Sequence, residues 1–278
     1  MDKGRLMSPY GDLYIYLVEG RVDESLGDQF GDKYLGNWVE DGWSFLFFTV
    51  PCRERIAADL REKQGLEIID EFHFPYSEWQ GGDVWPQRVA GFRIVPPWEK
   101  EDRSLRDEME IILDPGVVFG NGLHPTTRDC IRALVYLRRV ERFNRVIDLG
   151  TGTGILSLAA AKLGAGRVLA VDLNPLCVKT AMKNVSLNGL RSVVQVQRGK
   201  AEELVDTDAD LVLANIHYEV LEGLVRKAFF QDTRWFIFSG LMRTQARRLE
   251  RKLAESDLKV QKRWDHEMIW YTFLIRRS

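Results

Sequence analysis

The stretch Arg145-Val-Ile-Asp-Leu-Gly-Thr-Gly-Thr-Gly154 joins a short apolar strand to an acid and a glycine-rich turn. The next residues, 155–163, form an apolar run with the character of a helix. A glycine turn lets the backbone approach a ligand closely, and the start of a helix offers unpaired N–H groups. This order predicts a nucleoside-binding turn that uses Gly150, Gly152 and Gly154.

The spacing of the glycines distinguishes this turn from the dinucleotide fingerprint G-x-G-x-x-G, because Ile155 stands where the third glycine would be. Asp148 lies at the strand end, where its carboxylate could meet the cationic end of S-adenosylmethionine through water or a backbone amide. Asp172 follows the next strand-like run, 167–171, and is placed to accept both ribose hydroxyls. This pair of acids resembles the arrangement in class I methyltransferases.

Composition predicts a globular protein of two parts, because the chain has 278 residues and is 45% hydrophobic. The formal net charge of −2 gives no general attraction to phosphate backbones, so we expect no direct nucleic-acid binding. Apolar runs such as 45–48 are too short to span a bilayer. We therefore expect a cytoplasmic protein without membrane association, and we expect it to be a monomer.

The three cysteines, Cys52, Cys130 and Cys177, are odd in number and far apart. They form no C-x-x-C pair, so the sequence predicts neither a disulfide framework nor a metal site.

The order of elements predicts an α/β protein with two domains. Strands over 13–18, 43–50 and 66–72 and a helix over 53–63 indicate a small α+β domain in 1–75. Residues 76–110, which are rich in tryptophan, proline and glycine, are expected to be an interdomain linker. The remainder, 111–278, alternates strands and helices, which is typical of a doubly wound, mainly parallel sheet. Two closing strands, from 258 and 268, should include one antiparallel strand.

A third stretch, Phe119-Gly-Asn-Gly-Leu-His-Pro-Thr-Thr127, precedes the glycine strand and leads into a helix. Its glycines and its position predict a flexible lid that closes over the cofactor. Thr126 or Thr127 could cap the helix while turning a hydroxyl toward the methionine carboxylate. The expected lid residues are Phe119, Gly120, Gly122 and His124.

Several motifs occur together in one order, and their combination is specific where each alone is not. They are Trp98, Asp114-Pro-Gly116, the 119–127 stretch, the 148–154 loop, Asp172-Leu-Asn-Pro175, Ala214-Asn-Ile216 and Ser239-Gly-Leu241. Over roughly residues 79 to 278 the chain resembles the ribosomal protein L11 methyltransferases.

The resemblance implies a ferredoxin-like N-terminal domain that recognises L11 and a class I methyltransferase domain with a seven-stranded sheet. It implies trimethylation of lysine or N-terminal amino groups with S-adenosylmethionine. It also implies cofactor contacts at Thr127, Gly150, Asp172 and Asn215. The chain departs from the family at Asn121 and Leu123 in the lid and at His217, where an apolar residue is usual. A lysine methyltransferase of another protein therefore remains an alternative.

Asn215 and His217 are the candidate catalytic residues. Methyl transfer from a sulfonium needs an in-line neutral amine at about 3 Å and no strong general base. Asn215 could orient the amine through its side-chain oxygen, or it could hold the cofactor. His217 and His124 titrate near neutrality and could move a proton, or they could be structural.

Three other functions remain as alternatives. A methyltransferase acting on a nucleic-acid base is disfavoured, because Asn215-Ile-His-Tyr218 lacks the two prolines of the Asn-Pro-Pro-Tyr loop. A nicotinamide-dependent dehydrogenase would need the longer glycine spacing. A catalytically silent S-adenosylmethionine-binding module would keep Asp172 and the glycines but would lose the lid and Asn215.

Overall fold

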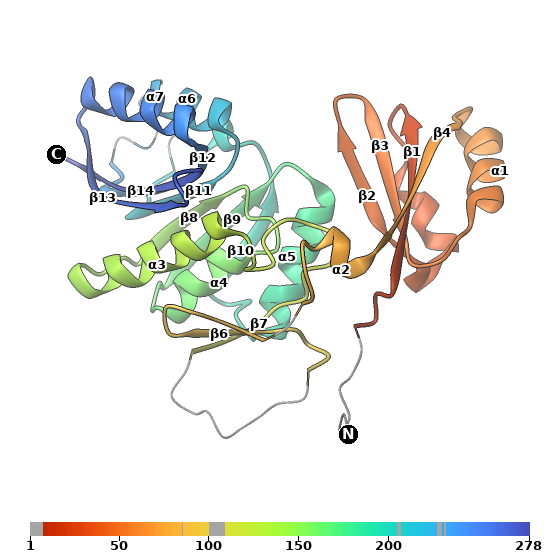
Figure 1. The fold of residues 1–278 in the computed structure, drawn as a ribbon, viewed down its shortest axis with the longest axis horizontal. Helices are drawn as coiled ribbons and strands as arrows, with labels where there is room; N and C mark the ends of the chain where they lie inside the picture. Colours follow the sequence, from red (N-terminus) through yellow and green to blue (C-terminus); the bar gives the residue numbers. More distant parts are fainter. Residues whose placement is uncertain (1–7, 85, 100–108, 205–206, 227–229, 231) are drawn as a thin grey trace.

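The structure is a computed structural model that describes residues 8–84, 86–99, 109–204, 207–226, 230 and 232–278. Figure 1 shows a small domain built on a sheet beside a larger domain in which helices cover both faces of a sheet. The small domain contains the start of the chain, and the large domain contains its end. The two-domain α/β fold expected from the sequence is confirmed.

The N-terminal domain is built on one antiparallel sheet with the strand order β2-β3-β1-β4. Its elements are β1 (Asp12–Glu19), β2 (Tyr34–Glu40), β3 (Trp43–Phe48), α1 (Arg53–Gln64) and β4 (Ile68–Pro75). Helix α1 covers one face and buries Ile56 and Leu60 against it. This is the ferredoxin-like order, in which two 3₁₀ segments, η1 (Glu24–Gln29) and η2 (Gly31–Lys33), replace the first helix.

Strand β2 was not predicted from the sequence. Glycine and asparagine are poor strand formers, and Gly36 and Asn37 stand in its middle. The pairing with β3 shifts register between Tyr34 and Gly36, which marks a bulge. The buried Asn37 side chain donates a 3.1 Å hydrogen bond to the carbonyl oxygen of Val22. A tertiary contact therefore stabilises a strand that local preference disfavours.

The segment expected to be a linker contains regular structure. It holds α2 (Tyr76–Trp79), β5 (Gln87–Val89) and β6 (Phe92–Val95), and β7 (Met109–Ile112) completes a three-stranded sheet with β5 and β6. Buried Val89, Phe92 and Ile94 belong to the same hydrophobic cluster as buried residues of the helices over 125–140 and 155–162. Residue 85 and residues 100–108 of the expected linker lie outside the described part of the chain. The small sheet thus packs as part of the larger domain.

The larger domain contains a seven-stranded sheet in the order β10-β9-β8-β11-β12-β14-β13. The strands are β8 (Arg145–Leu149), β9 (Arg167–Asp172), β10 (Val194–Arg198), β11 (Leu211–Asn215), β12 (Trp235–Met242), β13 (Leu258–His266) and β14 (Trp270–Arg277). The first five in chain order pair in parallel, whereas β14 is antiparallel to both β12 and β13. The expected class I methyltransferase sheet, with one antiparallel strand, is confirmed.

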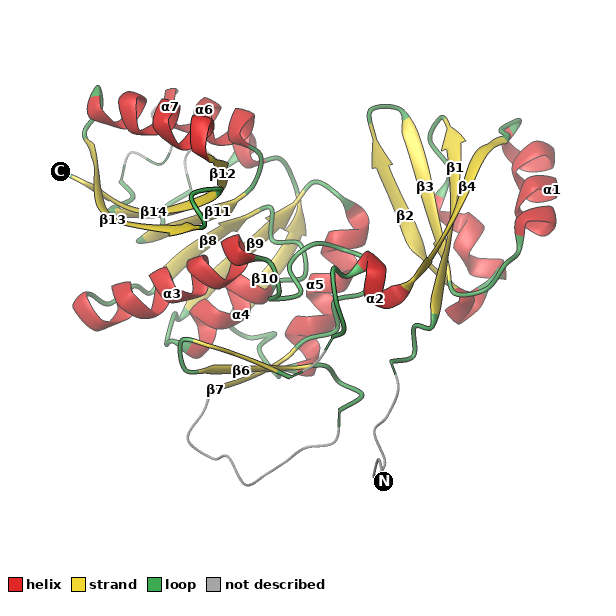
Figure 2. Cartoon of the chain, viewed as in Figure 1, coloured by secondary structure: helices red, strands yellow, loops and turns green. Residues whose placement is uncertain are grey.

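Helices cover both faces of this sheet, as Figure 2 shows. They are α3 (Pro125–Val140), α4 (Ile155–Lys162), α5 (Pro175–Leu187), α6 (Tyr218–Arg226) and α7 (Arg243–Ala254), and a 3₁₀ segment, η3 (Ala201–Glu203), follows β10. One apolar cluster joins α3 and α4 to the sheet, and a second joins α6 and α7 to its other face. Asn174 caps the start of helix α5, where its side chain accepts a 2.9 Å hydrogen bond from the N–H of Leu176.

The two domains meet through a shared apolar cluster. Buried Leu13, Ile15 and Phe47 from the N-terminal sheet pack with Val117, Val118, Leu176 and Cys177 of the larger domain. The hydroxyl of Tyr10 also donates to the carboxylate of Asp114 at 3.1 Å, and Lys183 pairs with the same carboxylate at 2.5 Å. These contacts fix the N-terminal sheet against the edge of the larger domain that carries α5.

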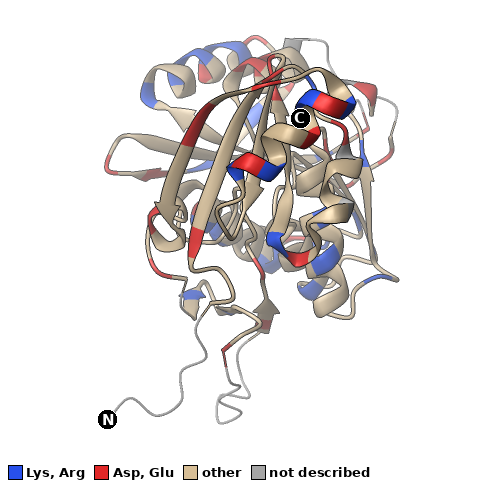
Figure 3. Cartoon of the chain, turned by 90° about the vertical axis from the view of Figure 1, so that its right-hand side faces the viewer, with Lys and Arg blue, Asp and Glu red and all other residues tan. Residues whose placement is uncertain are grey.

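The described residues include no helix that is long and apolar enough to cross a bilayer, and no group of side chains suited to a metal ion. Cys52, Cys130 and Cys177 are all free thiols. Figure 3 shows acidic and basic residues interspersed along the helices of the N-terminal domain. This distribution matches the small net charge of the chain.

Candidate functional site

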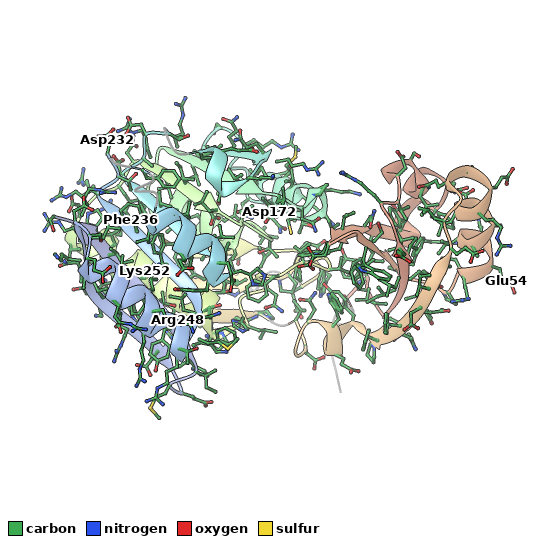
Figure 4. The ribbon with its side chains drawn as sticks, turned by 90° about the horizontal axis from the view of Figure 1, so that it is seen from above. Glu54, Asp172, Asp232, Phe236, Arg248 and Lys252 are labelled. Carbon is green, nitrogen blue, oxygen red and sulfur yellow. The ribbon has the colours of Figure 1, made fainter. Side chains whose placement is uncertain are left out.

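The glycine loop and Asp172 meet where β8 and β9 end. The N–H of Gly152 donates a 3.0 Å hydrogen bond to Oδ2 of Asp172, and the N–H of Asn174 donates to Oδ1 at 2.9 Å. Burial raises the pKa of Asp172, although these N–H groups favour its ionised form. Figure 4 shows Asp172 on the side of the larger domain that faces the N-terminal domain. The structure thus joins the two sequence features that predicted a nucleoside site.

Asp148 lies beneath the loop, with 1% of its surface exposed. Its Oδ2 accepts hydrogen bonds from the hydroxyls of Thr151 and Ser157, both at 2.7 Å, and from the Ser157 N–H at 3.1 Å. Burial raises the pKa of Asp148 to about 6. Its Oδ1 is buried and has no hydrogen-bond partner among the described residues. The carboxylate therefore orders the loop from below, and any ligand contact would involve Oδ1.

Two glycines of the loop are required by close approaches. A Cβ on Gly150 would lie 2.2 Å from the Ile216 side chain, and one on Gly152 would lie 2.5 Å from the carbonyl oxygen of Phe119. Both residues have positive φ, 67° and 54°. Only glycine therefore lets the loop lie between the lid and the end of β11.

The lid segment is fastened to its surroundings. The N–H of Thr153 donates to the Phe119 carbonyl at 3.1 Å, and the Thr153 hydroxyl donates to the Gly120 carbonyl at 2.7 Å. The Asn121 amide donates to the backbone and side-chain oxygens of Gln80 at 2.8 and 2.9 Å. The segment is thus attached both to the glycine loop and to the residue after α2. Its opening and closing remain a prediction.

Helix α3 is capped by His124, and the expectation that Thr126 or Thr127 caps it was wrong. The helix starts at Pro125, so both threonines are already inside its first turn. His124 Nδ1 lies 3.4 Å from the Thr126 N–H and 2.7 Å from the Thr126 hydroxyl. Thr127 is 1% exposed, and its hydroxyl is buried without a hydrogen-bond partner among the described residues. The Thr127 hydroxyl is therefore a buried polar atom that the described residues leave unsatisfied.

A cleft of about 1580 Å³ brings most of these elements together. The sequence-predicted residues that line it are Phe119, His124, Gly150, Gly152, Asp172, Asn215 and His217. Those that do not line it are Gly120, Gly122, Thr127, Asp148 and Gly154. Gly154 instead begins α4 with a positive φ of 85°. The cleft is thus formed by the loop, the end of β9, the end of β11 and the lid.

Asn215 is the last residue of β11, and His217 immediately precedes α6. Asn215 is half-buried, whereas the His217 side chain is exposed at the cleft. The Asn215 Oδ1 would lie 3.3 Å from a Cβ on Gly240, so β11 and the end of β12 approach closely here. Asn215 can present its amide to the cleft from a fixed strand end, and His217 can present its imidazole ring.

Sequence reasoning missed two tryptophans of the cleft. Trp270 begins β14, and Trp38 lies in the unpredicted strand β2. The His124 ring makes edge contacts with Phe119 and Trp270, with centroids 5.2 and 5.0 Å apart. Burial lowers the pKa of His124, and the nearby His266 lowers it further. His124 is therefore held toward its neutral form within an aromatic wall. No local pattern signalled either tryptophan, because both reach the cleft through the fold.

Comparison with known proteins agrees with this geometry. Residues 76–278 match the family described as ribosomal protein L11 methyltransferase (PrmA). A ribosomal protein L11 methyltransferase of Anoxybacillus flavithermus is 39% identical over 189 residues, which cover 67% of this chain and 60% of that protein. This match thus spans less than two thirds of that relative. One of Listeria monocytogenes is 32% identical over 276 residues, covering 90% of this chain and 86% of that protein.

A solved structure described as a ribosomal protein L11 methylase, from Lactobacillus delbrueckii, has 32% sequence identity and a TM-score of 0.58. The similarity covers 70% of this chain and 97% of that one.

Proposed function

Because this chain belongs to the ribosomal protein L11 methyltransferase family, we propose that it methylates lysine or N-terminal amino groups of L11 with S-adenosylmethionine. The observation that carries the proposal is the bond between Gly152 and Asp172. This bond supports the proposal because it joins a glycine loop to an acid at adjacent strand ends, which is where open α/β sheets bind nucleosides.

The residues present fit this cofactor. The unpartnered Thr127 hydroxyl and the unpartnered Oδ1 of Asp148 are buried polar atoms that a ligand or its water could satisfy. Gly150 and Gly152, where close contacts with Ile216 and Phe119 exclude a side chain, line the cleft with backbone that can meet a ligand. Asp172 would hold the ribose, and Thr127 would meet the amino-acid end.

The bound sulfonium would supply an activated methyl group. The chain would position the substrate's amine and favour its neutral form. Asn215 would orient the amine through its side-chain oxygen, and the aromatic wall of Phe119, His124 and Trp270 would exclude water. A lysine has an ordinary pKa near 10.4, and an apolar surrounding disfavours its ammonium form. His217, at the open side of the cleft, could carry the released proton to solvent.

The test is incubation of the purified protein with tritiated S-adenosylmethionine and recombinant L11, followed by mass spectrometry of labelled peptides. Label on L11 amino groups is the expected result. A parallel incubation with a cell lysate covers the second candidate function, methylation of lysine in another protein. Label on another protein alone would keep the chemistry and replace the substrate. Binding of S-adenosylmethionine without any transfer would instead indicate a catalytically silent module.

A further inference from the structure

A second cavity, of about 620 Å³, adjoins the cleft on the side of the N-terminal domain. Its walls include Trp38 and Phe45 from β2 and β3, Trp79 from α2, and Leu123 from the lid. Trp38, Glu40, Phe119 and His124 line both spaces, so the cavity opens into the cleft.

The bulge in β2 creates the cavity wall. After the register shift at Gly36, Trp38 pairs with Phe45 across the sheet, and both face away from α1. The larger domain covers part of this face through Val117, Val118 and Leu176 but leaves Trp38 and Phe45 half-exposed. Trp79 is 39% exposed beside them. An aromatic surface is thus left open next to the candidate active site.

Glu40 supplies the charge of this aromatic cavity. Its Oε2 accepts the indole N–H of Trp38 at 3.1 Å. No basic side chain pairs with Glu40 in the part of the chain that the structure describes. A carboxylate beside aromatic faces fits a lysine or arginine, because the stem packs on the rings while the cation meets both the acid and the π-faces.

We propose that this cavity binds a basic side chain of the protein substrate that is not itself methylated, which positions a neighbouring amine in the cleft. The proposal rests on the proposed function. The bound cation is not the methylated one, because a carboxylate partner would stabilise the ammonium form and oppose methyl transfer. Gly150, Gly152, Asp172 and Asn215, which would face the cofactor and the target amine, line the cleft and not this cavity. Glu40 is thus a specificity residue.

The test compares Glu40→Gln with Glu54→Gln, since Glu54 lies on α1 at the far end of the N-terminal domain (Figure 4). With L11 as substrate, Glu40→Gln should raise KM roughly tenfold, the loss of one charge-assisted contact, with kcat and S-adenosylmethionine affinity unchanged. Glu54→Gln should change none of these values. Equal KM values for the two variants would overturn the proposal.

A charge exchange identifies the partner residue. Each lysine and arginine of L11 is replaced in turn by glutamate, and each variant is assayed with wild-type protein and with Glu40→Arg. If KM for one substrate variant is near the wild-type value with Glu40→Arg but raised with the wild-type protein, the direct pairing is supported. Absence of recovery for every position would contradict it.

If wild-type protein does not methylate L11, the proposed substrate fails and the cavity is tested separately. A pentalysine peptide that is acetylated only at its N-terminus is then titrated calorimetrically into the wild type, Glu40→Gln and Glu54→Gln. Weaker binding to Glu40→Gln alone supports a cation site for a different substrate. Equal binding to all three proteins rejects it.

Discussion

The N–H of Gly152 lies 3.0 Å from Oδ2 of Asp172, so the turn after β8 is hydrogen-bonded to the acid that ends β9. The other oxygen of Asp172, Oδ1, accepts a hydrogen bond from the N–H of Asn174, which lies in the turn that starts α5. One carboxylate therefore sets the relative position of two ligand-facing turns. Its removal should affect both the shape of the cleft and the contact with ribose.

Asp172→Ala should lower the affinity for S-adenosylmethionine roughly a hundredfold, because two charge-assisted hydrogen bonds contribute about 3 kcal/mol in all. Isothermal calorimetry measures the change. Asp208→Ala is the control. Asp208 is exposed and pairs with Arg145 at the start of β8, which is the end of the strand away from the glycine loop. Unchanged affinity in Asp172→Ala would remove the ribose assignment.

Gly152→Ala should weaken S-adenosylmethionine binding at least tenfold, because the new Cβ would approach the Phe119 carbonyl and push the lid from the loop. Gly189→Ala separates this clash from backbone strain. Gly189 also has a positive φ, 65°, but nothing lies within 4 Å of its added Cβ. We expect Gly189→Ala to lose roughly 1 kcal/mol of unfolding free energy and to retain full binding. Similar binding losses in both variants would argue against the clash.

Leu176→Ala should lower the free energy of unfolding by about 2 to 4 kcal/mol, because Leu176 is 5% exposed within the interdomain cluster. Denaturant titration measures the loss, and faster proteolysis between the domains should accompany it. Leu187→Ala on the same helix removes a side chain that is 38% exposed. Its cost should stay below about 1 kcal/mol. Equal losses would mean that the domains do not dock through Leu176.

Asp148 should make the protein less stable as pH rises through its folded pKa. This pKa is raised to about 6 by burial, above the ordinary value near 4, so the folded state favours the protonated acid. Relative to Asp148→Asn, the wild type should lose roughly 3 kcal/mol of unfolding free energy between about pH 4 and pH 6. Denaturation at several pH values measures this difference.

Asp210 provides the control of opposite sign for Asp148. Although burial opposes it, the N–H groups of Arg145 and Asn144 and the Arg145 charge lower the pKa of Asp210. Relative to Asp210→Asn, the wild type should lose stability as pH falls through the lowered pKa. If the slopes for Asp148 and Asp210 have the same sign, the assignment whose predicted sign is missing is refuted.

Local sequence patterns gave reliable positions for most of the larger domain. Helix α4 and strand β9 match their expected ranges, 155–163 and 167–171, within one residue. Apolar periodicity, the Asn174 cap and the glycine turn are local signals that act within a few residues. The same signals failed at β2, because Gly36 and Asn37 obscured a strand that its neighbours stabilise.

The sequence by itself determined the doubly wound domain, the loop at Gly150 and the acid at Asp172, because short-range spacing dictates each of them. Only the tertiary structure decided that Asp148 points beneath the loop and that His124 caps α3. Only the fold brings Trp38 to the same cleft as Trp270. Side-chain direction, burial and the meeting of distant strands depend on packing between residues far apart in the chain, and no local pattern encodes that packing.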